Sequence, residues 1–388
     1  MTDGGRDGAI PGEGLEGIFH PGRIGTLLLA NRIVRSATNE GLADPEGRVG
    51  KRYADFMGRL ASGGMGLIVT GHLFVREEGR VSFRQGGIHD DDAIPGLRRA
   101  VHRVHDEGTR IVAQISHAGG QAARVGTGVP GTVAPSVVSD PAYGQVPREL
   151  SVEDLRVIVG SFAAAAVRAR EAGFDGVQLH VAHGYLLSQF LSPHRNVRRD
   201  AYGGSLAGRA RIVLEICEAV RKAVGPAYPV LVKINGEDFV DGGLVMADAR
   251  VVAAKLAAAR VDAIEISGGL PSSKVPSIFR MGISSVGEEG YYLSFAEAVR
   301  TDVRVPVISV GGFRSPDFVN RVLRSGATDF VSMSRPFIRE PGLVSRWSRG
   351  DLRRATCISC NLCLRASRSE EGVHCVVDRK PGEGVSPP

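Results

Sequence analysis

Eight short apolar runs, each followed by a segment with helical spacing, constrain the fold of this 388-residue chain more than any other feature. Each run is β-branched or nearly continuously apolar, which is typical of a strand buried on both faces of a parallel sheet. The runs occupy residues 32–37, 66–70, 111–115, 176–180, 230–234, 263–267, 307–310 and 330–333. The helical segments occupy residues 52–61, 96–107, 152–172, 208–224, 246–259, 295–299, 315–325 and 342–347. Eight strand–helix repeats predict an α/β fold, the (β/α)8 TIM barrel.

An open, doubly wound sheet is the rival architecture. Such a sheet usually has fewer strands and a G-x-G-x-x-G turn after its first strand. Here the first run is followed by Thr-Asn-Glu-Gly at residues 38–41. We therefore expect one barrel over residues 17–345, after a flexible segment of residues 1–16. Residues 119–149 are rich in Gly, Pro and Ser, and we expect them to form a loop or lid over a site.

Composition excludes several classes of protein. Hydrophobic residues make up 43% and charged residues 23% of the chain, which excludes disordered and collagen-like chains. The sequence has no run of about 18 apolar residues and no apolar signal segment at its start, so we expect a cytoplasmic protein without a membrane span. The net charge of +6 is spread along the chain, without a basic helix carrying interleaved aromatics. Nucleic acid is therefore not expected as a partner, and a small-molecule substrate is.

Two histidines and a tyrosine follow the fourth run, at the end of a barrel strand where catalytic residues usually lie. His180 and His183 could both donate a hydrogen bond to a carbonyl or phenolate oxygen and polarise it. Tyr185 is a candidate proton donor beside them. A buried structural histidine with a core tyrosine is the alternative, and a zinc site is a second alternative that has no evident third ligand nearby.

Polar residues also follow the second, third and fifth runs. His72 could reach a ligand at the barrel mouth or lie in a solvated loop. Gln114 can donate and accept at once, which suits the edge of a heteroaromatic ring. Lys233 requires an anionic or electron-rich ligand, or a salt bridge to an acid such as Glu265 on the next strand.

Glycines and an arginine follow the last two runs, where a TIM barrel commonly binds phosphate. The backbone N–H groups of Gly311 and Gly312 can approach an anion closely, and Arg335 adds a cation. A phosphate anchor beside ring-polarising groups suits a phosphorylated heteroaromatic cofactor, and flavin mononucleotide (FMN) is the obvious candidate. Turn glycines with a surface arginine are the alternative.

The sequence resembles the old yellow enzyme family of flavin-dependent ene-reductases over residues 18–341. The matching motifs are NRIV at 31–34, GFDGV at 173–177, HVAHGYL at 180–186, QFLSP at 189–193, YGGS at 202–205, PVISVGG at 306–312 and Arg335-Pro336. The resemblance implies that NAD(P)H reduces FMN and leaves. An α,β-unsaturated carbonyl compound would then bind and have its C=C bond reduced. Relatives are often dimers or tetramers, so a homo-oligomer is expected.

The resemblance also implies roles for individual residues. His180 and His183 resemble the pair that binds the substrate's carbonyl oxygen, and Tyr185 resembles the residue that protonates the α-carbon. Expected cofactor-binding residues are Ser36, Ala37, Thr38, Asn39, His72, Gln114, Lys233, Gly311, Gly312, Ser334 and Arg335.

Four cysteines gather in the tail formed by residues 346–388. In a chain without a secretory signal, Cys357, Cys360, Cys363 and Cys375 indicate a metal or cluster site before disulfides. The tail resembles the subgroup that contains 2,4-dienoyl-CoA reductase and trimethylamine dehydrogenase, in which such cysteines bind a [4Fe–4S] cluster. Zinc is the competing occupant, because four cysteines also suit a zinc ion. Thirteen residues follow Cys375, so the FAD domain of that subgroup is expected to be missing. A cluster would then receive electrons from another protein, or it would be structural.

Three functions follow from these expectations. The leading hypothesis is an FMN-dependent reductase of activated C=C bonds. The second is a flavin-dependent dehydrogenase or demethylase that passes electrons through an iron–sulfur cluster to a partner. The third is a non-catalytic, zinc-stabilised barrel.

Overall fold

The computed structural model describes residues 14–122, 131–273, 278 and 280–378. Eight parallel strands close into a barrel, in the order β3, β4, β6, β9, β10, β11, β12 and β13, and β13 pairs with β3. Their bounds are β3 Ile33–Arg35, β4 Leu67–Val69, β6 Arg110–Ser116, β9 Gly176–Val181, β10 Val230–Asn235, β11 Ala263–Ser267, β12 Val307–Val310 and β13 Phe330–Met333. Each expected strand overlaps one of these, which confirms the predicted TIM barrel. A short strand, β5 (Leu73–Phe74), pairs with β6 outside the closed ring.

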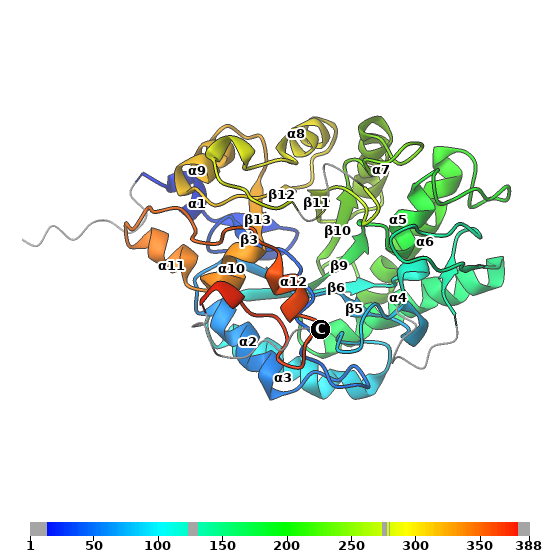
Figure 1. Ribbon diagram of the computed structural model, residues 1–388, viewed down its shortest axis with the longest axis horizontal. Helices are drawn as coiled ribbons and strands as arrows, with labels where there is room; N and C mark the ends of the chain where they lie inside the picture. The colour runs from blue at the N-terminus through cyan, green and yellow to red at the C-terminus, as the bar shows by residue number, and fades with distance from the viewer. Residues whose placement is uncertain (1–13, 123–130, 274–277, 279, 379–388) are drawn as a thin grey trace, which may run out of the picture.

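Helices surround the strands (Figure 1). Those expected from the sequence are α2 Lys51–Ala61, α3 Ile94–His105, α4 Val152–Glu171, α6 Leu206–Val224, α7 Met246–Ala258, α8 Leu293–Asp302, α9 Pro316–Arg324 and α11 Leu343–Ser348. Helix α4 begins where its sequence predicts, because Ser151 Oγ accepts from the Asp154 N–H at 3.1 Å and the Asp154 carboxylate accepts from the Ser151 N–H at 2.8 Å.

Short elements complete the fold. The short helices are α1 Glu16–Phe19, α5 Leu186–Leu191, α10 Arg335–Arg339 and α12 Leu362–Ala366, with 3-10 turns at Glu77–Gly79, Asp91–Ala93, Gly119–Gln121, Val286–Glu288 and Val376–Asp378. Two small pairs are β1 (Gly22–Ile24) with β2 (Leu27–Leu29) and β7 (Val133–Ala134) with β8 (Arg148–Glu149). Residues 1–13 of the expected flexible segment lie outside the described residues, and Glu16 already belongs to α1.

Two apolar layers hold the barrel together. The larger one lies between the strands and the surrounding helices. The smaller one fills one end of the barrel interior, where Val34, Leu67, Val112 and Leu231 meet the apolar side chains of the β1–β2 hairpin. The hairpin thus closes one end of the barrel, so the interior is a packed core, and the polar residues lie toward the other end.

The cysteine-containing tail packs against the barrel and is part of the same body. The Val373 N–H donates to the Glu40 carbonyl at 2.7 Å, and the Ala355 N–H donates to the Arg314 carbonyl at 2.9 Å. A side chain at Gly41 would collide with the Ser367 carbonyl, so glycine is required for this approach. Figure 1 shows this orange-to-red segment running from α11 to α12 beside the strands. Within the described residues, we find no helix long and apolar enough to cross a membrane.

Candidate functional site

One cavity of about 260 Å³ lies at the carboxyl ends of the barrel strands, and most of the sequence-predicted residues line it. Thirteen of the fourteen predicted catalytic and flavin-binding residues lie in its wall: Ser36, Ala37, Thr38, Asn39, His72, Gln114, His180, His183, Tyr185, Lys233, Gly312, Ser334 and Arg335. Gly311 does not line the cavity. Its carbonyl accepts from the N–H groups of Gly290 and Tyr291, so it supports the wall from behind.

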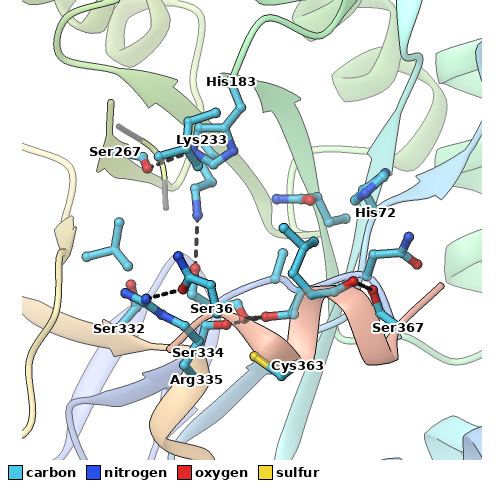
Figure 2. A pocket seen from close by; sticks show the side chains of 18 of the residues that line it. Ser36, His72, His183, Lys233, Ser267, Ser332, Ser334, Arg335, Cys363 and Ser367 are labelled. Atoms are coloured by element: carbon cyan, nitrogen blue, oxygen red, sulfur yellow. Dashed lines mark hydrogen bonds between the residues drawn. The ribbon is translucent and has the colours of Figure 1, made fainter. Parts of the chain in front are cut away.

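A buried ion pair lies at the cavity wall because the strand register places its members opposite each other. Lys233 on β10 pairs in register with Glu265 on β11, and Lys233 Nζ lies 3.2 Å from Glu265 Oε1. Nζ also donates to Ser36 Oγ at 2.9 Å (Figure 2). Both sequence interpretations of Lys233 therefore have a basis, because it forms the salt bridge and also lines the cavity.

The Glu265 carboxylate is the acceptor for a set of buried donors. Ser36 and Ser332 donate to Oε1 at 2.6 and 2.8 Å, and Gln178 donates to Oε2 at 3.0 Å. Burial alone would raise the pKa of Glu265, but the positive charge of Lys233 and these hydrogen bonds outweigh it and lower that pKa. Glu265 is therefore ionised at neutral pH and neutralises the charge of Lys233.

A chain of amides reaches from this carboxylate to the cavity wall. Gln178 accepts from Gln114 Nε2 at 2.7 Å, since strands β6 and β9 place these two residues in register. The other side-chain atom of Gln114, Oε1, is buried and has no hydrogen-bond partner. A buried acceptor without a partner is costly, so this atom is positioned for a ligand that donates a hydrogen bond.

The two predicted histidines lie together at the end of β9, with ring centroids 5.3 Å apart. The backbone at His183 is left-handed, with a φ of 61°. Burial and neighbouring positive charges hold the pKa of His180 and of His183 well below the ordinary value, so both rings are neutral at pH 7. His183 Nε2 lies 2.7 Å from Ser267 Oγ, as Figure 2 shows, whereas His180 Nδ1 is buried without a partner.

Tyr185 contacts both His180 and His72, with ring centroids 4.7 and 5.0 Å apart. Burial raises the pKa of Tyr185 above its ordinary value, which keeps the phenol protonated.

Hydrogen bonding determines which ring nitrogen of His72 carries the proton. Gln85 Oε1 accepts from the Val81 N–H at 2.7 Å, so Gln85 Nε2 must be the donor to His72 Nδ1, also at 2.7 Å. In the neutral ring the proton is then on Nε2, which lies 3.4 Å from the Tyr185 oxygen.

This tautomer leaves the Tyr185 hydroxyl with a free proton. The Tyr185 oxygen accepts from His72, so its own O–H is available to donate into the cavity. Burial lowers the pKa of His72 to about 4, which keeps the ring in the neutral form that this arrangement requires. His72 therefore contacts Tyr185 through its Nε2–H and also lines the cavity.

Arginines gather at the opposite end of the cavity, near the predicted phosphate site. Arg335 and Arg314 line the cavity there, and the guanidinium of Arg280 lies 4.4 Å from the ring centre of Tyr291. Gly312 has a φ of 76°, and a Cβ atom there would lie 2.7 Å from the Tyr291 ring. The described lining contains no Asp or Glu, so this end of the cavity suits an anion.

The tail forms part of the cavity wall, which the sequence did not predict. Cys363 and Leu364 of α12, with Asn361, Ser367 and Arg368, line the same cavity as the histidines. Figure 2 shows Cys363 and Ser367 on the side of the pocket opposite His183 and Lys233. Arg335 Nη1 donates to Asn361 Oδ1 at 2.5 Å, and Arg314 donates to the Cys357 carbonyl and to Ser359 Oγ.

The four tail cysteines line a second, smaller cavity. Its wall includes Cys357, Cys360, Cys363 and Cys375, and it shares Arg335, Asn361 and Cys363 with the larger cavity. Burial, followed by the charge on Cys357, raises the pKa of Cys363 to about 11. Among the described residues, no three His, Cys, Asp or Glu side chains are arranged to hold a single metal ion. The predicted ligation of a metal by these cysteines stays a prediction.

Other lining residues were missed by the sequence reasoning. These are chiefly Tyr143, Ser267, Tyr291, Tyr292, Arg314, Ser332 and Arg368. Some of them carried a readable signal: Arg314 comes two residues after Gly312, and Ser332 alternates with Ser334 at the end of β13. Ser267 is the last residue of β11, so its place at the strand end was also readable. The others come from long connections or from the tail, whose path over the barrel no periodicity predicts.

Comparison with known proteins agrees with this geometry. Residues 17–352 match the family described as NADH:flavin oxidoreductase / NADH oxidase. The chain is 38% identical over 94% of its length to a metal reductase of Desulforamulus reducens, of which it covers 54%. It is 36% identical over 93% of its length to a 4,4'-dithiodibutanoate disulfide reductase of Rhodococcus erythropolis, of which it covers 94%.

Structural comparison gives the same result. A 2-naphthoyl-CoA reductase matches 92% of the chain with a TM-score of 0.86 and 26% sequence identity, and the chain covers 56% of that protein. The chain thus spans about half the length of two of these three relatives. It belongs to the NADH:flavin oxidoreductase family, the family of the old yellow enzymes.

Proposed function

We propose that the chain reduces the C=C bond of an α,β-unsaturated carbonyl compound with electrons that NAD(P)H supplies through FMN. One observation carries this proposal: two neutral histidines and a protonated tyrosine lie in the same cavity as the residues expected to hold FMN. Such a group of donors suits a carbonyl oxygen that gains negative charge during the reaction.

The residues present fit FMN. The unpartnered Gln114 Oε1 can accept from a ring N–H, and Lys233 provides a cation beside it. At the other end, Gly312 leaves room for close approach, and Ser334 and Arg335 can bind phosphate. When bound, FMN takes a hydride from the nicotinamide and gives a hydride to the β-carbon of the substrate.

The side chains then supply binding and the proton. The N–H groups of His180 and His183 would hold the carbonyl oxygen and stabilise the negative charge that forms on it. Tyr185 would donate its proton to the α-carbon, so that one hydride and one proton together saturate the bond. His72 keeps the Tyr185 hydroxyl proton directed away from itself, because its own Nε2–H faces the Tyr185 oxygen.

The test is anaerobic reduction of the purified flavoprotein with NADH or NADPH, followed by reoxidation with 2-cyclohexenone. We expect the flavin absorbance to bleach and to return with one equivalent of cyclohexanone formed. The double variant His180→Ala/His183→Ala should keep flavin but lose the charge-transfer band with phenols. Loss of flavin from that variant would instead mean that the pair is structural. Bleaching by nucleotide without reoxidation by any enone would contradict the proposal.

A second candidate is favoured by the four cysteines that line one cavity beside the first. The two cavities share Cys363, so a redox centre held there would lie next to the flavin site. Four thiolates can bind either a zinc ion or a four-iron cluster. The wall that the two cavities share favours the cluster, because zinc is not redox-active and could not accept electrons from the flavin site.

This second function is a dehydrogenase that oxidises its substrate and exports electrons through the cluster to an electron-transfer protein. Iron and acid-labile sulfide analysis tests the cluster, and about four of each per chain are expected. Zinc without iron would overturn it. Failure of both nucleotides to bleach the flavin, together with cluster reduction by an amine substrate, would favour this function over the first. Family membership gives no support to a non-catalytic zinc-stabilised barrel.

A further inference from the structure

The balance of charge around the main cavity leaves one cation without a described partner. Lys233, Arg314, Arg335 and Arg368 line the cavity, and the described lining contains no acid. Lys233 is neutralised by Glu265, and Arg314 and Arg335 hold the tail at the phosphate end. No side-chain hydrogen bond or ion pair of Arg368 occurs among the described residues. The nearby acid Glu370 pairs with Arg84 instead, at 3.7 Å.

Arg368 lines the same cavity as Tyr185 and follows Ser367, which Figure 2 shows on the His72 side of the pocket, away from Arg335. The ring of His72 lies 5.0 Å from that of Tyr185, so this is the side where the substrate's reacting carbon is expected. Its positive charge acts on the phenols of Tyr185 and Tyr143 and lowers their pKa values against the larger effect of burial. By contrast, the phenol of Tyr291 at the other end is influenced by Arg335, Arg280 and Arg314. Arg368 therefore stands on the Tyr185 side, together with Tyr143 from the long loop after β6.

Arg368 is exposed, and its backbone is held by the tail. Its N–H donates to the Arg365 carbonyl at 3.1 Å, directly after α12, and the Ser367 N–H donates to the Cys363 carbonyl at 3.0 Å. The chain is further fixed where Ser367 lies against Gly41. An exposed guanidinium on a fixed backbone at a cavity rim can meet a ligand anion without the large desolvation cost of a buried charge.

We propose that Arg368 determines specificity by binding a carboxylate on the part of the substrate that extends past Tyr185 toward the rim. The substrate class is then an α,β-unsaturated carbonyl compound that carries an acidic group away from its reacting bond. This inference rests on the proposed reductase function and narrows its substrate. A planar guanidinium and a carboxylate form paired, charge-assisted hydrogen bonds, which give selectivity over a neutral ester of the same shape.

The experiment compares two matched substrates, (E)-7-oxooct-5-enoate and its methyl ester, at low ionic strength. In the unaltered holoenzyme we expect kcat/KM to be about tenfold higher for the acid, and the ratio to fall with added salt. Arg368→Gln should bring the ratio near one, and Arg368→Glu should invert it. Arg365→Gln is the matched control, because Arg365 is an exposed neighbour that does not line the cavity, and its ratio should stay near ten.

Binding provides a second readout that does not depend on turnover. Titration of the oxidised flavoprotein with 4-hydroxyphenylalkanoates and their methyl esters should show tighter charge-transfer binding of the acids, lost in Arg368→Gln. Equal ratios in the unaltered enzyme and in Arg368→Gln would overturn the inference while leaving the reductase function intact. If neither enone is reduced, the reductase function itself fails.

A phosphate group of NADH or NADPH is the other anion that Arg368 could bind in place of a substrate carboxylate. The dissociation constants of NADH and NADPH, measured by flavin bleaching in Arg368→Gln, separate the two sources. We expect them to change less than twofold. A tenfold weakening toward either nucleotide, with an unchanged acid-to-ester ratio, would assign Arg368 to the nucleotide and overturn the proposal.

Discussion

Replacing Lys233 by methionine should destabilise the barrel, because the change leaves the Glu265 carboxylate buried without its cation. The Glu265 side chain is 0% exposed and that of Lys233 is 4% exposed, so water does not replace the lost charge. Breaking a buried ion pair in this way typically costs 3–5 kcal/mol. Ser36, Ser332 and Gln178 still donate to the carboxylate, so we expect the lower end, about 3 kcal/mol.

The measurement is the thermal midpoint of the flavin-free protein, followed by the fluorescence of Trp347, the single tryptophan of the chain. Trp347 is buried in α11 and donates to the Arg353 carbonyl at 3.1 Å, so its emission changes when this part unfolds. An unfolding entropy of about 2.1 cal/mol/K per residue gives about 0.8 kcal/mol/K for 388 residues. A loss of about 3 kcal/mol then lowers the midpoint by about 4 °C.

The pH dependence and a double variant test the cause. In the unaltered protein, the lowered pKa of Glu265 contributes stability above pH 4.5, which is lost as pH falls through the folded-state pKa. Without Lys233 that pKa rises, so the destabilisation should be greater at pH 8 than at pH 5. Lys233→Met/Glu265→Gln should recover most of the loss. A double variant no more stable than Lys233→Met alone would refute the reasoning.

Four further outcomes follow from the geometry. Gly312→Ala should weaken FMN binding at least tenfold in a fluorescence titration, because its Cβ would press on the Tyr291 ring, whereas Gly326→Ala, also at positive φ but in open space, should leave FMN affinity unchanged. Burial lowers the pKa of His72 from 6.5 to about 4, so the free energy of unfolding should decrease as pH falls from 6.5 toward 4, by at most about 3 kcal/mol. His72→Gln should therefore show a smaller loss in urea midpoint between pH 7.5 and pH 5. Cys363→Ser should lower bound iron per chain and also change the flavin spectrum, since Cys363 lines both cavities; an unchanged iron content would contradict its role as a ligand. Ser151→Ala should cost about 1 kcal/mol at the start of α4 without changing FMN content, as measured by urea unfolding.

The barrel strands could be predicted because each one is buried on both faces and therefore reads as a continuous apolar run. Strands β11, β12 and β13 begin and end at the predicted residues, while β3 and β4 are shorter than their runs. The β1–β2 hairpin was missed because each strand has only three residues and no alternation long enough to identify. Its role in closing the barrel depends on contacts with Leu67 and Phe330, which are distant in sequence.

The site could be predicted to a similar depth and for a related reason. Parallel strands bring their carboxyl ends to one edge, so residues that follow strands meet even when they are far apart in sequence. That argument placed His180, Gln114 and Lys233 in one cavity, and the structure agrees. It could not place Tyr143 or Arg368, because each belongs to a connection whose course is determined by packing and not by strand order.

The boundary expected at residue 345 separates two parts of the chain that contact each other closely in the structure. Composition separates an apolar barrel from a cysteine-containing tail, but Arg314 and Arg335 follow barrel strands and bind tail atoms. A guanidinium has five N–H donors, so Arg335 can hold Asn361 and still bind a phosphate. The tail also supplies Cys363 and Arg368 to the cavity wall. Because the same arginines serve the tail and the expected phosphate site, the described part of the tail completes the cavity and does not merely follow the barrel.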